Sequence, residues 1–349
     1  MSVAVPTRRE LLVALTWPAL PAAGASPEAA ATARLLAARY PVHAPLGYVG
    51  ALTASAQRRL NGGRLPPGSR QALLALREAA PAVPPIDWPV RAGHAAFAEA
   101  ALHDSDTASR ELALQAVRTA IIETAQGPRL AGLRNWTDDL FMAALLFDRA
   151  RPLLPGAEQP RAAEALAATL LTHAERLQRG DGLFDHAEGS PVAWGCGNGF
   201  ASLGFALALA GPTPSTASQD GARLLPRLQA HLRALLPLQQ EDGLWRQVLD
   251  DAASPVELTA TAMNLTALAM ARSRGWLPAG TADGAIARAW AAVNRRIDAE
   301  GGFSDVCAST PAGPTLAFYR NRPITSGRDD RAAALVLQAA LAMGAAGQA

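Results

Sequence analysis

Apolar residues recur at three- and four-residue spacing through most of the chain after residue 26. This helical period is clearest in seven segments: 72–80, 111–125, 164–177, 224–238, 264–277, 286–297 and 332–343. A further helix should begin at Ser26, because Ser26 can cap it and Pro27 then occupies the first helical position. Alternating runs of β-branched residues are nearly absent, so the pattern predicts an all-α protein.

The loops between these predicted helices contain a repeat. Three helices end in an acidic residue, a glycine, one further residue and an aromatic residue, at 181–184, 242–245 and 300–303. We expect Gly182, Gly243 and Gly302 to be left-handed helix terminators. They recur about sixty residues apart, which is the length of two helices with two loops. About six such hairpins fit the chain, which predicts an (α/α)6 barrel forming a single domain over residues 26–349.

Residues 1–25 have a different pattern. Arg8 and Arg9 precede an uncharged stretch that ends in small residues, which is typical of an export signal of the twin-arginine type. The pattern favours an exported, periplasmic protein; the alternative is a cytoplasmic protein with an irregular arm, because Pro18 and Pro21 interrupt the apolar stretch. The stretch is too short to span a bilayer, so we expect no membrane segment.

Composition excludes several classes of function. The 32 basic and 30 acidic residues leave a net charge of +2 without a basic block, which argues against binding nucleic acid. Cys196 and Cys307 are too few for a disulfide framework or a four-thiolate zinc site. Histidine pairs at metal-ligand spacing are also missing from the sequence, so we expect neither a metal ion nor another cofactor.

One predicted helix start, in residues 134–147, carries candidate chemistry. Asn135 or Thr137 can cap this helix, which places Asp138 and Asp139 in its first turn, beside Trp136. Adjacent helical residues point about 100° apart, so the two carboxylates cannot both enter one pocket. The alternative to catalysis is a structural role, because a carboxylate in a first turn gains a few tenths of a kcal/mol from the helix dipole.

Other polar and aromatic residues cluster in the predicted loops. Asp87 precedes another predicted helix, where it could be a simple N-cap. The long connection 182–200 carries His186 and Trp194 and is more typical of a binding rim than of a plain linker. Trp245 and Gln247 follow the second glycine repeat. Several arginines in residues 319–330 could pair with a carboxylated ligand, or form a solvated surface.

Taken together, these segments resemble the unsaturated rhamnogalacturonyl hydrolases of glycoside hydrolase family 105, which are related to the family 88 unsaturated glucuronyl hydrolases. The matching segments occur in order through most of the chain: HAPLGYVGAL (43–52), IDWPVRAGHAAF (86–97), WTDDLFMA (136–143), GLFDHAEG (182–189), WGCGNGF (194–200), GLWRQVLD (243–250) with ELTATAM (257–263), and ITSGRDD (324–330). Each segment is modestly specific, and their order makes the resemblance specific.

The resemblance implies an (α/α)6 barrel that hydrolyses unsaturated uronyl oligosaccharides, the products of polysaccharide lyases. In that family an aspartate protonates C4 of the C4–C5 vinyl ether and assists the addition of water at C5. Carried onto this chain, Asp138 is the proton donor and Asp87 is similar to the second carboxylate. Substrate contacts are then expected at Trp136, His186, Trp194, Trp245, Gln247 and His43. The neighbouring sugar and the oligomeric state stay open.

The chain departs from the family pattern in the substrate loop. Cys196 stands where the family often has arginine, Phe200 stands where it often has tryptophan, and a histidine common before the Trp-x-Asp segment is missing. An inactive carbohydrate-binding barrel is therefore an alternative. A second alternative is a triterpene-cyclase-like toroid, because residues 239–245 match its Gln-x-x-x-Gly-x-Trp repeat. However, the chain is 5% aromatic and lacks an Asp-x-Asp-Asp motif.

Overall fold

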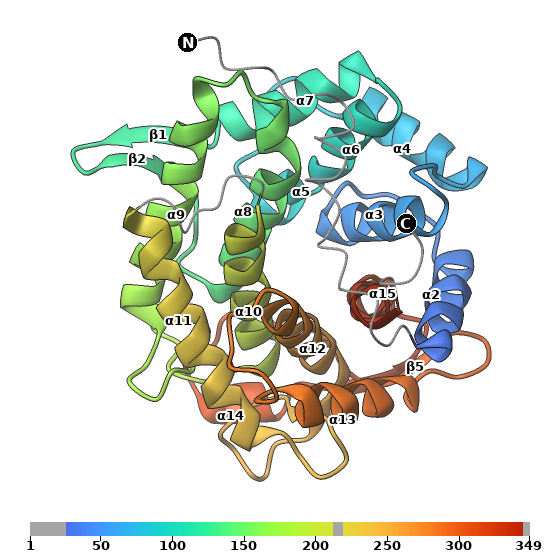
Figure 1. Cartoon of the computed structure of the whole chain (residues 1–349), viewed down its shortest axis with the longest axis vertical. Coiled ribbons are helices and arrows are strands. Elements are labelled where there is room, and N and C mark those ends of the chain that lie inside the picture. The colour runs from blue at the N-terminus through green and yellow to red at the C-terminus, as the bar shows by residue number, and fades with distance from the viewer. Residues whose placement is uncertain (1–25, 212–218, 345–349) are drawn as a thin grey trace.

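The computed structural model describes residues 26–211 and 219–344, so the predicted export signal in residues 1–25 lies outside the described residues. Helices dominate the structure and form two concentric rings (Figure 1). The inner ring consists of α3 (Tyr48–Leu60), α5 (Trp88–Ala92) continued by α6 (Ala95–His103), α8 (Thr137–Ala150), α10 (Gly195–Ala210), α12 (Leu258–Ser273) and α15 (Asp330–Gly344). The ring closes because α8 packs against α10, α10 against α12, α12 against α15, α15 against α3, α3 against α5, and α5 against α8.

The outer ring alternates with the inner one along the chain. It consists of α2 (Pro27–Arg39), α4 (Pro67–Ala79), α7 (Thr107–Arg118), α9 (Glu158–Leu177), α11 (Gln219–Leu235) and α13 (Asp283–Asn294). Each outer helix packs on inner helices next to it in the chain, as α11 does on α10 and α13 on α12. This alternation confirms the predicted (α/α)6 barrel. The cap at Ser26 is also confirmed, because its hydroxyl accepts the Ala29 N–H at 3.3 Å.

Short strands connect several helices, which the all-α prediction missed. Antiparallel pairs join β1 (Ile121–Thr124) to β2 (Gly127–Leu130), β3 (Trp245–Arg246) to β4 (Val256–Glu257), and β5 (Phe303–Cys307) to β6 (Ile324–Gly327). Short helical turns η1 (Arg151–Leu153), η3 (Leu236–Leu238) and α14 (Leu316–Arg320) complete the connections. The predicted helix over 111–125 was too long: it ends at Arg118, and the β-branched pair Ile121 and Ile122 begins a hairpin instead.

The repeated glycines let each hairpin pack against the next outer helix. Gly182 and Gly243 have φ angles of 92° and 95°, which favour glycine. A Cβ atom at Gly182 would lie 2.8 Å from the carbonyl oxygen of Ala230, and one at Gly243 would lie 2.4 Å from that of Arg288. In the third repeat the positive φ angle, 83°, belongs to Gly301, so the prediction of Gly302 was wrong. These glycines also lie in turns that follow the helices, and not at the helix ends as predicted.

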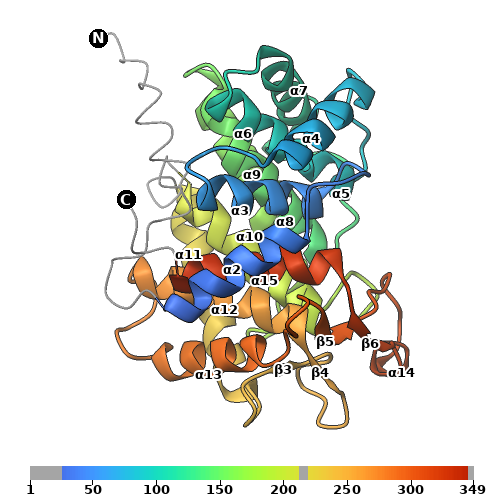
Figure 2. The same cartoon turned by 90° about the vertical axis from the view of Figure 1, so that its right-hand side faces the viewer.

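The ends of the inner helices place residues that are distant in sequence beside one another. Cys196, in the first turn of α10, donates to the carboxylate of Glu257 at the start of α12. The strands β5 and β6 and the short helix α14 lie together at one side of the double ring (Figure 2). Within residues 26–211 and 219–344, every helix is too short or too polar to cross a membrane.

A buried histidine, His231, links the two rings and makes the stability of the fold sensitive to acid. The imidazole of His231, on α11, is fully buried, and its two nitrogens lie 3.1 Å from the carbonyl oxygens of Gly182 and Asn198. Burial lowers the pKa of His231 to about 4, although both carbonyl groups act in the opposite direction. The unfolded chain therefore takes up a proton at higher pH than the folded chain does.

We expect the free energy of unfolding to fall as pH falls from about 6.5 towards about 4, because only the unfolded state then protonates His231. His231→Gln should reduce the slope by up to about 1.4 kcal/mol per pH unit. Urea titrations across this window measure it. His43→Gln, at a side chain that is 45% exposed, is the control, and an unchanged slope in His231→Gln would contradict the prediction.

Candidate active site

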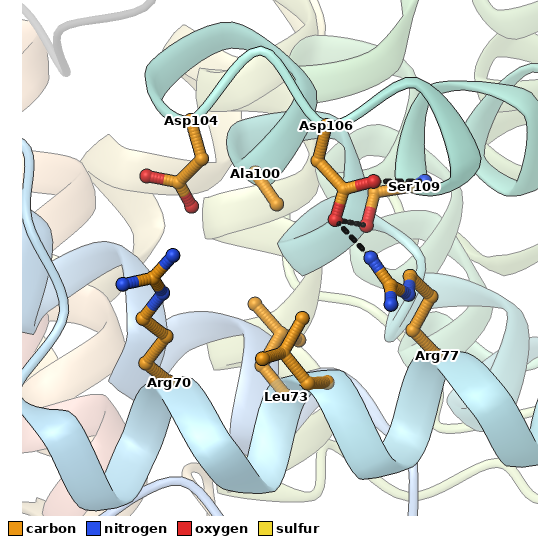
Figure 3. A pocket seen from close by; sticks show the side chains of 8 residues that line it. Arg70, Leu73, Arg77, Ala100, Asp104, Asp106 and Ser109 are labelled. Atoms are coloured by element: carbon orange, nitrogen blue, oxygen red, sulfur yellow. Dashed lines mark hydrogen bonds and ion pairs between the residues drawn. The ribbon is translucent and has the colours of Figure 1, made fainter.

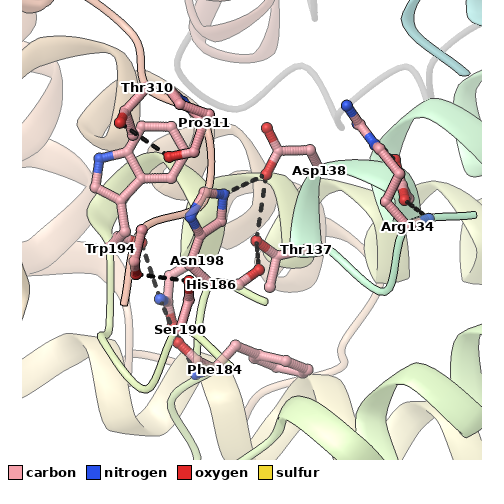
Figure 4. A network of polar contacts seen from close by, with 12 residues as sticks. Arg134, Thr137, Asp138, Phe184, His186, Ser190, Trp194, Asn198, Thr310 and Pro311 are labelled. Carbon is pink, nitrogen blue, oxygen red and sulfur yellow. Dashed lines mark hydrogen bonds and ion pairs between the residues drawn. The ribbon is translucent and has the colours of Figure 1, made fainter. Parts of the chain in front are cut away.

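The N-terminus of α8 presents one carboxylate to a buried histidine. Asp138, in the first turn of α8, has a side chain that is 15% exposed. Its Oδ2 atom lies 3.1 Å from Nε2 of His186, which the loop between α9 and α10 holds fully buried (Figure 4). The hydroxyl of Thr137 is 3.4 Å from the same oxygen. Among the described residues, the other oxygen, Oδ1, has no hydrogen-bond partner, so it is the oxygen free to meet a ligand.

A chain of hydrogen bonds fixes the orientation of His186. Its Nδ1 atom lies 2.5 Å from the hydroxyl oxygen of Tyr319, which accepts the Gly313 N–H at 3.0 Å. The Tyr319 proton is thus available for Nδ1, and the neutral imidazole then carries its own proton on Nε2 and donates it to Asp138. Burial raises the pKa of Tyr319, which keeps that hydroxyl protonated at neutral pH.

Two indole rings flank His186. The ring centroid of Trp194 lies 4.4 Å from that of His186, and the centroid of Trp136 lies 5.5 Å from it on another side. Trp194 is 1% exposed, and its indole nitrogen is buried without a partner within the described residues. Trp136 is half-buried and carries the guanidinium of Arg134 over its ring at 4.2 Å. Of the two rings, Trp136 is the more accessible to a ligand.

Asp139 is part of a buried ion pair. Its carboxylate accepts from the Arg134 side chain at 2.7 Å and from the Arg134 backbone N–H at 2.5 Å. The side chain is fully buried, and burial raises its pKa although Arg134 opposes this. The two aspartates thus diverge as predicted, but Asp139 does more than interact with the helix dipole. The predicted caps were wrong: Trp136 is at the N-cap position and makes no side-chain capping bond.

Asp87 lies near the same arginine without contacting Asp138. It stands at the N-cap of α5, is exposed, and makes no capping hydrogen bond with its side chain. Burial lowers the pKa of Arg134, but the carboxylates of Asp139, Asp138 and Asp87 raise it on balance. Arg134 therefore pairs directly with Asp139 and interacts at longer range with the charges of Asp138 and Asp87.

Two of the expected substrate contacts belong to the core. Trp245 is fully buried, and its indole N–H donates to the carbonyl oxygen of Leu235 at 2.8 Å. Gln247 is also fully buried and donates to the carbonyl oxygens of Tyr319 and Arg322, at 2.8 and 3.2 Å. Gln247 therefore holds the segment that carries Tyr319, and we assign both residues a supporting role.

The hydrogen-bond and ion-pair partners of His43 are Pro41 and Asp330, and neither belongs to the His186 cluster. The His43 side chain is 45% exposed, and Nε2 is 3.4 Å from a carboxylate oxygen of Asp330, at the start of α15. Sequence reasoning did not single out Tyr319 or Arg134. Both stood in segments selected for other residues, and the 133 positions that separate His186 from Tyr319 give no local signal of their contact.

Other polar sites in the structure lack the features of a reaction centre. The thiol of Cys196 is buried, and its pKa is raised well above the usual range by burial, by the hydrogen bond with Cys307 and by Glu257, so it is not a reactive thiolate. Within the described ranges, no group of three or more His, Cys, Asp and Glu side chains could hold a metal ion. A pocket of about 240 Å³ between α4, α6 and α7 has its polar wall formed partly by the Arg77–Asp106 ion pair (Figure 3).

The comparison with known proteins assigns the chain to a family. The sequence model of Glycosyl Hydrolase Family 88 matches residues 129–343, a range that contains Asp138, His186 and Tyr319. The chain belongs to glycosyl hydrolase family 88. This family 88 chain is also 33% identical over 139 residues to the unsaturated rhamnogalacturonyl hydrolase YesR of Bacillus subtilis. That match covers 38% of this chain and 36% of YesR, so it spans about a third of the relative's length.

Solved structures share the fold of this family 88 chain along almost its whole length. A possible family 105 member from Klebsiella pneumoniae superposes with a TM-score of 0.74 at 17% identity, covering 98% of this chain and 95% of the other. The unsaturated glucuronyl hydrolase of Bacillus sp. GL1 gives a TM-score of 0.64 at 15% identity, with 96% of each chain covered. The resemblance to families 105 and 88 is confirmed.

Substituting phenylalanine for Trp194 and for Trp245, one at a time, separates the roles of these two residues in this family 88 chain. Trp245→Phe removes the buried hydrogen bond from the indole N–H to the Leu235 carbonyl oxygen, whereas Trp194→Phe removes no such bond. We therefore expect Trp245→Phe to lower the free energy of unfolding by about 1–2 kcal/mol more than Trp194→Phe does. Urea denaturation measures both, and an equal or larger loss in Trp194→Phe would refute the assignment.

Proposed function

We propose that this protein hydrolyses unsaturated (4,5-ene) uronyl oligosaccharides, the products of polysaccharide lyases. The observation that carries the proposal is the free Oδ1 of Asp138, held by the Tyr319–His186 chain at the end of the inner ring of a family 88 chain. The likeness to YesR, named an unsaturated rhamnogalacturonyl hydrolase, supports the same chemistry.

The reaction needs one group that first gives and then takes a proton. Oδ2 of Asp138 accepts from His186, so the transferable proton of the carboxyl group sits on Oδ1. Asp138 passes this proton to C4 of the vinyl ether, and positive charge develops at C5 and the ring oxygen. Water adds to C5 and returns a proton to the Asp138 carboxylate. The resulting hemiketal opens, and the neighbouring sugar leaves as an alcohol.

The arrangement of carboxylates fits this hydration better than displacement at the anomeric carbon. Retaining and inverting glycosidases use two carboxyl groups that face the scissile bond from opposite sides. Here Asp139 is buried and committed to Arg134, and Asp87 is an exposed residue on α5. Asp138 is thus the acidic group best placed to act alone.

The second candidate is a carbohydrate-binding barrel without activity. Cys196 favours it, because the thiol occupies a position where the resembling family often has arginine. Turnover separates the two functions: a panel of lyase-digested polysaccharides is incubated with the protein, and loss of the ultraviolet absorbance of the enol ether is followed. We expect at least one digest to lose this absorbance. Binding of unsaturated saccharides without any loss would favour the inactive barrel.

The two neighbouring aspartates should differ sharply in their kinetics. Asp138→Asn keeps the shape of the side chain but removes the transferable proton, so kcat should fall by on the order of 10²–10⁴-fold. Asp139→Asn should lower the free energy of unfolding by about 1–3 kcal/mol, because it weakens the buried contact with Arg134. The folded fraction of this second variant should retain most of its activity. An active Asp138→Asn would refute the proposed acid.

Tyr319 should act by positioning His186. Tyr319→Phe removes the partner of Nδ1, so His186 no longer holds a single orientation and tautomer towards Asp138. We expect kcat to fall by roughly 10–100-fold and KM to change little. Arg320→Gln is the matched control, because Arg320 anchors the same short helix, α14, through its ion pair with Asp251 at 2.6 Å and makes no hydrogen bond to His186 or Tyr319. Equal losses in both variants would indicate a role in loop folding alone.

A further inference from the structure

The arginines of the 319–330 segment are mostly committed to protein partners. Arg320 pairs with Asp251 at 2.6 Å, and Arg322 donates to the carbonyl oxygen of Ser309 at 2.7 Å. Arg328 binds the carbonyl oxygen of Arg39 and lies 3.3 Å from Asp330. These three arginines are therefore poor candidates for the predicted pairing with a carboxylated ligand.

The next residue in the chain, Arg331, has a different environment. It lies in the first turn of α15, is partly exposed, and donates to the carbonyl oxygen of Cys307. Throughout the described part of the chain, no carboxylate oxygen lies within ion-pair distance, 4.0 Å, of its guanidinium. A guanidinium has five N–H donors, so most of its hydrogen-bonding capacity is available.

The acidic residue at the start of the neighbouring helix α12, Glu257, is already satisfied by other donors. The Glu257 carboxylate accepts from the backbone N–H groups of Thr259, Ala260 and Cys307, at 3.0, 2.5 and 3.0 Å. It also accepts from the Thr259 hydroxyl and the Cys196 thiol. Glu257 is thus fixed in place as the cap of α12, and its charge attracts Arg331 without a direct ion pair.

Tyr48 links this arginine to the proposed proton donor. Its ring packs edge-on against Phe141 and Phe200, each at 6.0 Å between centroids, and its hydroxyl has no hydrogen bond to any described residue. Burial raises the pKa of Tyr48; the guanidinium of Arg331 opposes that rise and the carboxylate of Asp138 adds to it. The Tyr48 ring thus contacts α8 at Phe141, one turn after Asp138, and is carried by α3, which packs against the helix that carries Arg331.

We propose that Arg331, together with the Tyr48 hydroxyl, binds the carboxylate of the unsaturated uronate whose C4 Asp138 protonates. This inference rests on the proposed function. The substrate carries a carboxylate on C5, and burying that charge requires a cation with free donors. Arg134, whose pKa the Asp138 carboxylate helps to raise, is already paired with Asp139. Arg331 thus makes the site specific for the free acid over its ester.

The test compares one substrate in two forms. The lyase-derived disaccharide that turns over fastest is assayed as the free acid and as its methyl ester on the unsaturated ring. For the wild type we expect a clear preference for the acid in kcat/KM. Arg331→Gln should lower kcat/KM for the acid by roughly 10–100-fold, mainly through KM, and should change the value for the ester less than about threefold.

Two further variants sharpen this comparison. Arg331→Lys should restore part of the preference for the acid, because lysine keeps the charge and loses the bidentate fork. Arg328→Gln is the control: its exposed guanidinium pairs with Asp330, and the acid preference should be that of the wild type. Because both substrates meet the same folded fraction, the acid-to-ester ratio is unaffected by partial misfolding of a variant.

The outcomes separate this inference from the proposed function. A wild type that consumes an unsaturated disaccharide, together with an unchanged acid-to-ester ratio in Arg331→Gln, overturns the role of Arg331 and leaves the proposed function standing. A wild type that consumes no lyase product overturns the proposed function and this inference with it. A ratio that collapses in Arg331→Gln and is normal in Arg328→Gln supports the inference.

Discussion

The close approach of α10 to its neighbours in the inner ring is the constraint on which the rest of the site depends. A Cβ atom at Gly204 would lie 2.8 Å from the backbone of Leu140 on α8, so only glycine permits this contact. One turn from the start of α10, a Cβ atom at Gly197 would lie 2.6 Å from the Thr137 hydroxyl and 3.2 Å from the His186 ring. The same packing that closes the ring therefore leaves the space in which His186 reaches Asp138. A substitution that pushed α10 away from α8 would therefore disturb both the packing of the inner ring and the contact between His186 and Asp138.

The site itself is assembled by loops that the two rings hold in place. His186 lies in the loop before α10, and Tyr319 comes from α14, so their contact depends on the backbone of the 313–322 segment being fixed. The Gln247 side chain fixes that backbone by donating to the carbonyl oxygens of Tyr319 and Arg322, and the Ser190 hydroxyl fixes it by donating to the carbonyl oxygen of Gly313. These buried polar bonds orient His186 at a position where packing of apolar side chains alone would leave rotational freedom.

The parts of this structure that could be predicted from sequence are those with a local signal. Helical periodicity and the repeated glycines predicted the double ring, and the 100° step between Asp138 and Asp139 predicted that they diverge. Partners far along the chain gave no such signal. Trp245 looks like a binding aromatic in sequence, but it follows the glycine turn directly and so enters the core, where Leu235 accepts its N–H. Tyr319 and Arg331 were missed because their neighbours, His186 and Tyr48, are brought to them by ring closure. The arginines of residues 319–330 marked a segment that does contain Tyr319, but Arg320, Arg322 and Arg328 themselves bind other parts of the protein.

The position of Arg331 also changes how the substitution at Cys196 is interpreted. A thiol in place of the arginine common at this position in the resembling family suggests, in sequence, a site that has lost a positive charge. In the structure, Cys196 donates to Glu257, and the guanidinium of Arg331 lies within electrostatic reach of both groups. The positive charge is therefore still present at this end of the barrel, carried by α15 in place of α10. Cys196 is then a packing residue beside Glu257, so it supports an inactive barrel less strongly in the structure than it does in the sequence.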